Sequence, residues 1–157
     1  MWDAVSRRQV VSVVAIGAFA GCVGSLPGTG SHDEGEVFAT GEIDILIDDE
    51  PLDLTADRFQ AEHADDYAIE FHLHDFDEYW YMEGDRYVTL AEGLDKLPEF
   101  SFETTDDDHV LTIDDETYDT SAGAEISFLV NEESVTPADY TLADGDEILV
   151  EITTEQD

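Results

Sequence analysis

The sequence has very few basic residues and a single cysteine. Only 5 of its 157 residues are Lys or Arg, against 41 Asp or Glu, which gives a formal net charge of −36 at pH 7. Such an acidic chain is a poor partner for nucleic acid, because its field repels phosphate groups. The lone Cys22 leaves no second thiol for an intramolecular disulfide, so stability must come from packing.

The sequence also lacks an apolar run long enough to cross a bilayer, which takes about 20 residues. The best candidate, Val10 to Ala20, falls short of that length. It follows Arg7 and Arg8, and this paired arginine with the apolar residues after it resembles a twin-arginine export signal. The resemblance implies that the segment directs export rather than spanning the membrane.

The residues that end this segment, Phe19-Ala20-Gly21-Cys22, resemble a lipobox, with Phe19 at the position where leucine is usual. The resemblance implies that residues 1–21 are a signal peptide and that Cys22 becomes a lipidated N-terminus. We therefore expect the protein at the cell membrane, on its extracellular face, with the membrane as a partner through the lipid on Cys22.

Three regions are expected after the signal. Residues 22–41 form a flexible tether, because 23–35 are rich in Gly, Ser, Thr and Pro. Residues 42–153 form an acidic globular domain, as one unit or as two small lobes, and 154–157 form a tail. Since 42% of the chain is hydrophobic, we expect a folded core rather than disorder.

Removal of the signal leaves three basic residues, Arg58, Arg86 and Lys96, against 40 acids, a formal charge of −37. Screening reaches about 10 Å at 0.1 M salt and about 3 Å at 1 M. The mature protein should therefore repel itself in dilute buffer and tolerate molar salt. In this respect it resembles exported proteins of salt-loving archaea.

Short apolar runs between acidic turns favour strands. The expected strands cover Ile43–Ile47, Ala68–His74, Tyr79–Met82, Val110–Ile113, Ile126–Val130 and Ile148–Ile152. One helix is expected over about 89–97, with Thr89 and Glu92 as a capping box and Pro98 as its stop. The predicted fold class is α+β, a mostly antiparallel sheet carrying one helix.

Two further patterns concern the C-terminal part. Residues 125–152 resemble the last strands of β-grasp domains, although the chain ends Glu-Gln-Asp rather than in the diglycine of sulfur carriers. Residues 42–50 also echo residues 125–133, since each reads as a strand entering an acidic turn. A true duplication and two ordinary hairpins both explain the echo.

The candidate chemistry lies between Phe71 and Glu83. A hairpin through this segment places His72 opposite Tyr81, with a core face on one side of the strands. His72 and His74 then share the other face about 6.6 Å apart at the backbone, close enough for both imidazoles to reach one ion. Alternatively, both are ordinary polar residues on a half-wetted sheet face.

The same segment resembles a family of uncharacterised extracytoplasmic proteins with the pattern His-x-His-Asp followed by a second His-x-Glu. His72, His74, Asp75 and Glu83 match it, and Tyr81 stands where the family has its third histidine. The likeness covers roughly residues 63–152. It strengthens the metal hypothesis, in which zinc or copper is held by His72 and His74, with Glu83, Tyr81 or His63 filling the coordination sphere.

Other chemistry is disfavoured by the sequence. The acidic clusters fit no EF-hand template, and there is no nucleophile elbow, P-loop, dinucleotide fingerprint or cysteine nucleophile. Two functions remain: a lipid-anchored binding or interaction module with a protein partner, and a zinc- or copper-binding lipoprotein. A hydrolytic metalloenzyme is the least supported alternative, and no catalytic residue is assigned.

Overall fold

The computed structural model of the protein describes residues 36–75 and 77–155, which belong to one compact unit. Its strands are β1 (Val37–Ile47), β2 (Glu50–Pro51), β3 (His72–Leu73), β4 (Tyr79–Gly84), β5 (Phe100–Thr104), β6 (His109–Ile113), β7 (Glu116–Asp119), β8 (Glu125–Val130), β9 (Glu133–Ser134) and β10 (Ile148–Thr153). Its helices are α1 (Leu90–Lys96) and the 3₁₀ turns η1 (Asp57–Phe59), η2 (Ala61–His63) and η3 (Thr120–Ala122). Within these described ranges, no helix has the length and apolar character needed to cross a membrane.

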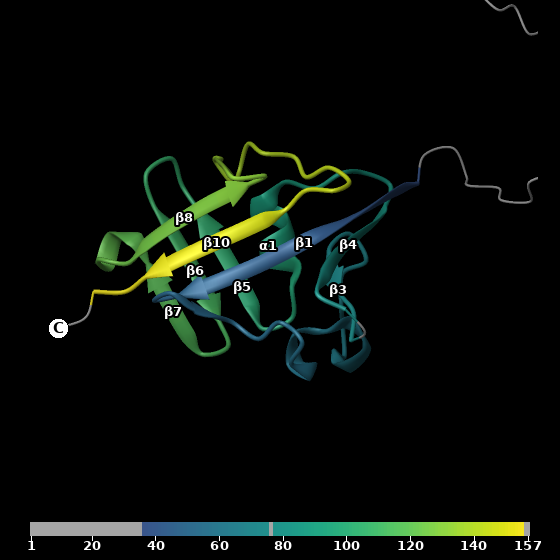
Figure 1. Ribbon diagram of the computed structural model, residues 1–157, viewed down its shortest axis with the longest axis horizontal. Coiled ribbons are helices and arrows are strands. Elements are labelled where there is room, and N and C mark those ends of the chain that lie inside the picture. Colours follow the sequence, from purple (N-terminus) through teal and green to yellow (C-terminus); the bar gives the residue numbers. More distant parts are fainter. Residues whose placement is uncertain (1–35, 76, 156–157) are drawn as a thin grey trace, which may run out of the picture. The chain divides into compact units, whose positions relative to one another are not determined.

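The larger sheet is built around two long central strands. Its order is β3-β4-β1-β10-β8-β9, and β2 pairs with the last residues of β1. The first and last strands, β1 and β10, run parallel, whereas the other pairs are antiparallel. A second, antiparallel sheet has the order β5-β6-β7. Figure 1 shows β1, β10 and β8 in one layer, with α1, β5 and β6 in the layer behind.

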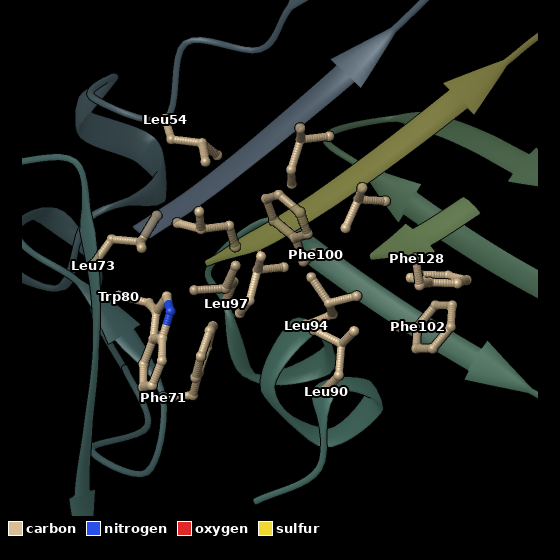
Figure 2. Close-up of a cluster of buried hydrophobic side chains, with 14 of the residues drawn as sticks. Leu54, Phe71, Leu73, Trp80, Leu90, Leu94, Leu97, Phe100, Phe102 and Phe128 are labelled. Atoms are coloured by element: carbon tan, nitrogen blue, oxygen red, sulfur yellow. The ribbon is translucent and has the colours of Figure 1, made fainter. Parts of the chain in front are cut away.

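One hydrophobic core fills the space between these layers. Period-two alternation turns Ile43 and Ile45 of β1 inward, while Glu42 and Asp44 face solvent. The second sheet contributes Phe100 and Phe102. Figure 2 shows these phenylalanines gathered with Leu90, Leu94 and Leu97 of the helical segment, and with Phe71, Leu73 and Trp80 of the hairpin β3–β4.

Helix α1 begins where its capping box predicts. The Thr89 side chain accepts a hydrogen bond from the Glu92 amide, and the Glu92 carboxylate accepts one from the Thr89 amide. Glu92 and Lys96 lie four residues apart on the helix, a spacing that suits an ion pair, but they do not pair with each other. Instead Arg86 binds Glu92 through two nitrogens, each 3.1 Å from a carboxylate oxygen, and Lys96 lies 3.9 Å from Glu70.

The predicted fold class is confirmed: the protein is α+β, with a mostly antiparallel sheet and one α-helix among the described residues. The first and last strands pair in parallel, and the β-grasp resemblance of residues 125–152 stays a prediction. The two echoing segments fold alike, as a strand and a two-residue turn with positive φ at Asp48 and Asp49, and at Asn131 and Glu132. Their common origin stays a prediction.

The predicted boundaries need three corrections. The sheet begins at Val37 rather than near Gly41, so the end of the expected tether, 37–41, is part of β1, where it pairs with β4. The strand expected over 68–74 shrinks to β3, because Ile69 and Glu70 form a turn. The expected tail starts too early, since Thr154 donates two hydrogen bonds to Asp48, each of 2.7 Å.

Candidate functional site

The hairpin β3–β4 has the predicted register. His72 lies opposite Tyr81, and Leu73 lies opposite Trp80. The side chains on its inner face are all buried, namely Phe71, Leu73, Trp80 and Met82. Phe71 and Trp80 stack with their ring centroids 5.5 Å apart, and both point into the core in Figure 2. This packing fixes which face of the hairpin carries His72.

His72 does not lie on a half-wetted face, which was the alternative to a ligand role. Its side chain is only 1% exposed. The ring of Tyr67, from the segment before β3, lies 5.4 Å from the imidazole, and the ring of Tyr81 stacks on it with the centroids 6.0 Å apart. Burial, together with the nearby His74, lowers the pKa of His72. The neutral imidazole is therefore the favoured form.

A chain of polar contacts runs through the two imidazoles. Nδ1 of His72 lies 3.1 Å from the carbonyl oxygen of Ile69, and its Nε2 lies 3.1 Å from Nε2 of His74. Nδ1 of His74 contacts a carboxylate oxygen of Glu62, in η2. The second oxygen of Glu62 accepts a hydrogen bond of 3.1 Å from the Asp75 amide. Both imidazoles are thus held at their Nδ1 atoms.

These partners decide where the protons lie. A carbonyl oxygen only accepts, so Nδ1 of His72 carries a proton, and neutral His72 presents a lone pair at Nε2. Nδ1 of His74 likewise donates to Glu62. Burial opposes the charge on Glu62, yet the hydrogen bonds from His74 and from the backbone lower its pKa overall, so it remains a carboxylate. The gap between the two Nε2 atoms can hold one proton or one metal ion.

The Nε2 atoms have the spacing of two ligands on one ion. An ion about 2.0–2.1 Å from each nitrogen, with the nitrogens 3.1 Å apart, would see them at an angle of about 100°. That angle suits neighbouring positions in tetrahedral zinc and in tetragonal copper(II). An Nδ1–H that donates to a carbonyl or carboxylate is also the usual outer partner of a metal-bound histidine.

Glu83 and Tyr81 stand beside the pair in different ways. Oε2 of Glu83 lies 3.7 Å from Nε2 of His72, and its side chain is half exposed and can swing inward. The Tyr81 hydroxyl instead donates to Asp77, and this bond, aided by burial, raises the pKa of Tyr81 to about 12. A phenolate ligand is therefore disfavoured, and the Tyr81 ring packs against both imidazoles.

His63, the last candidate ligand, lies in η2 with its Nε2 turned to two carboxylates, 3.7 Å from Asp57 and 3.8 Å from Asp75. These contacts give the His63 imidazole carboxylate partners of its own. Among the residues that the structure describes, no group of three or more His, Cys, Asp or Glu side chains is arranged to hold a metal ion. The site is therefore a pair of nitrogens, with Glu83 as the nearest third donor.

Glu62, whose carboxylate contacts Nδ1 of His74, was not predicted from the sequence. It sits in a short 3₁₀ turn twelve residues before its partner, and no periodic pattern marks such a turn. Tyr67, which covers His72, was missed for the same reason. Both come from the segment between β2 and β3, whose path over the hairpin depends on tertiary packing.

An acidic cleft is lined by residues of β1 and of the β3–β4 loop, among them Asp75, which follows His74 in the chain. It has a volume of about 580 Å³ and is lined by Glu42, Ile43, Asp44, Thr55, Asp75, Asp77, Glu78 and Tyr79. Its carboxylates create a negative potential that raises the local concentration of cations. The His74 side chain itself is a quarter exposed.

Comparison with protein families, with curated proteins and with solved structures finds nothing that matches this chain. The resemblances to a twin-arginine signal, a lipobox and the His-x-His-Asp family therefore stay predictions. The export and lipidation residues, Arg7, Arg8 and Cys22, lie outside the described residues.

Proposed function

We propose that the protein is an exported, salt-adapted lipoprotein on the outer face of the cell membrane that binds a divalent transition-metal ion, zinc or copper(II). His72 and His74 supply two nitrogen ligands, and Glu83 supplies an oxygen. The remaining positions are open to water or to a ligand from outside. Such a module suits the capture or delivery of an ion.

One observation carries the metal part of the proposal. Both Nδ1 atoms are held by acceptors, the Ile69 carbonyl and the Glu62 carboxylate, and both Nε2 atoms face each other at 3.1 Å. In the metal-free form the two Nε2 atoms contact each other directly. An ion bound between them replaces this contact and competes with protons for the two nitrogens, so metal affinity should fall as the pH falls.

The location rests on the sequence. The start of the chain resembles a twin-arginine signal followed by a lipobox at Cys22. The large excess of acid supports a salt-rich medium, where screening removes the self-repulsion. A Cys22→Ser variant should therefore lose its lipid mass and accumulate outside the membrane fraction. Retention in the membrane without the thiol would contradict the anchor.

The metal site is tested with the processed protein, purified without a histidine tag in molar salt. Zinc and copper(II) are titrated by calorimetry, and the bound metal is counted by elemental analysis. We expect close to one ion per chain, and loss of binding in the His72→Gln/His74→Gln double variant. His109→Gln is the matched control, because His109 is another partly buried histidine with a lowered pKa.

Folding is checked by circular dichroism, since His72 is buried and its replacement can unfold the hairpin. The single His74→Gln variant guards against this outcome because His74 is partly exposed. No bound metal in the parent protein at excess ion would contradict the proposal. Equal binding in the parent protein and in a folded His74→Gln variant would contradict it as well.

A further inference from the structure

Large hydrophobic side chains are exposed at one end of the fold. Four of them, Phe38, Tyr67, Ile69 and Tyr87, form what we call the apolar end. Phe38 is the most exposed, at 59%. Surface hydrophobic residues are ordinary when scattered singly, but a group of them marks an interaction surface.

The hydrogen-bond register places Phe38 and Ile69 on either side of Glu83, and Tyr67 and Tyr87 lie near them in the chain. Phe38, near the start of β1, lies opposite Glu83 of β4, and the Glu83 amide donates to the Ile69 carbonyl oxygen at 2.9 Å. Tyr67 comes two residues earlier and packs on His72. Tyr87 follows Gly84, which pairs with Val37. In Figure 1 the start of β1 and the end of β4 lie at the same end of the molecule.

Two of the scarce cations lie there too. Arg86 pairs with Glu92, and Lys96 lies 3.9 Å from Glu70, so two nearby acids are compensated. By contrast, the cleft at the other end of β1, which includes Asp49, Glu125 and Glu151, has no Lys or Arg among its described lining residues.

We propose that the apolar end docks on the lipid surface to which the protein is anchored. The chain that leads to the lipid enters the fold here, because the described residues begin at Glu36, directly before β1. Phe and Tyr side chains suit the membrane interface, where an apolar ring meets water. Molar salt screens the repulsion between the acidic protein and anionic headgroups, and leaves apolar contact as the dominant force.

The docking adds a second contact to the proposed lipid. The chain from Cys22 to Glu36 can reach at most about 50 Å, so the lipid sets the distance from the membrane without setting the orientation of the domain. Stable anchoring by lipidation generally takes two signals, and the apolar end supplies the second. The inference rests on the proposed lipid anchor, but not on metal binding.

Tryptophan reporters test the docking in the lipidated protein, reconstituted in phosphatidylcholine vesicles in molar salt with and without brominated phosphatidylcholine. Phe38→Trp and Tyr87→Trp place reporters at the apolar end, and Ser127→Trp places a control at an exposed position of β8. The native Trp80 is fully buried, and its signal is subtracted with the parent protein. We expect brominated lipid to quench the reporters at positions 38 and 87, and to leave the reporter at position 127 unquenched.

Flotation of the vesicles separates the docking from the anchor. Protein that floats with the vesicles, but whose reporters at positions 38 and 87 are no more quenched than the one at position 127, would overturn the docking and leave the anchor standing. Protein that does not float would overturn both the anchor and the docking. A lipid-independent change at position 38 that tracks dimer formation would assign the surface to a second copy and overturn the proposal.

Discussion

Two histidines of this protein, the buried His72 and the partly buried His109, have lowered pKa values and different surroundings. His72 faces a second imidazole, which is itself held by a carboxylate. His109, in β6, binds the Thr104 hydroxyl at 2.7 Å and packs against the rings of Phe102 and Phe128. Burial is the largest cause of the lowered pKa in both cases. A lowered pKa alone therefore does not distinguish the two histidines, whereas the polar partner of each imidazole does.

Metal affinity should separate the two histidines most strongly. A Glu62→Gln substitution removes the carboxylate that contacts Nδ1 of His74. Loss of such an outer partner typically lowers metal affinity by about 10–100-fold. Thr104→Val removes the corresponding partner of His109 and should leave the affinity unchanged. Calorimetric titration with zinc in molar salt measures both. Equal zinc affinities for Glu62→Gln and Thr104→Val would contradict the assignment of the metal site to His72 and His74.

A phenylalanine substitution separates the regions by stability. His72→Phe removes the polar contacts of His72 with the Ile69 carbonyl and with Nε2 of His74, which should lower the free energy of unfolding by about 1–3 kcal/mol. His109→Phe keeps a ring between two phenylalanines and loses one hydrogen bond, so we expect about 0.5–1.5 kcal/mol at most. Urea unfolding of the metal-free proteins gives both values. A larger loss in His109→Phe would reverse the comparison.

The pH dependence of stability should distinguish His72 from His109 the least. Because both histidines have pKa values below the ordinary value of about 6.5, the unfolded chain takes up protons first on acidification. Their contribution to the free energy of unfolding is fully present above about pH 6.5 and is lost as the pH falls toward the folded-state pKa. The loss is at most about 1.4 kcal/mol per pH unit for each group, and it is smaller for His109, which water partly screens. His109→Phe should flatten the profile between about pH 6.5 and 5. An unchanged slope would show that His109 does not titrate differently on folding.

Patterns confined to neighbouring residues predicted their structures well. The capping box of α1 and the two-residue register of β3 and β4 follow from side-chain spacing alone, and both are confirmed. The strand β5 was missed although Phe100 and Phe102 alternate with polar residues, as a strand requires. In β7 only Tyr118 is buried, so the sequence carries almost no pattern there.

The candidate site was predicted in part. His72 and His74 were selected because a strand puts alternate residues on one face, and their Nε2 atoms do meet. Their supports were not predicted, since Glu62 and the carbonyl of Ile69 belong to turns without periodicity. Nor did alternation reveal that Tyr67 covers His72, because an outward-facing residue becomes buried only when another segment folds over it.

The proposed function depends on one ion that bridges the Nε2 atoms of His72 and His74. Long-range ¹H–¹⁵N NMR of the histidine rings during a zinc titration observes these atoms themselves. We expect the two Nε2 resonances to shift together to metal-bound values at one equivalent, while the Nδ1 protons persist and His109 stays unchanged. Zinc that leaves both Nε2 resonances in place, or that shifts His109 equally, would contradict the bridged ion.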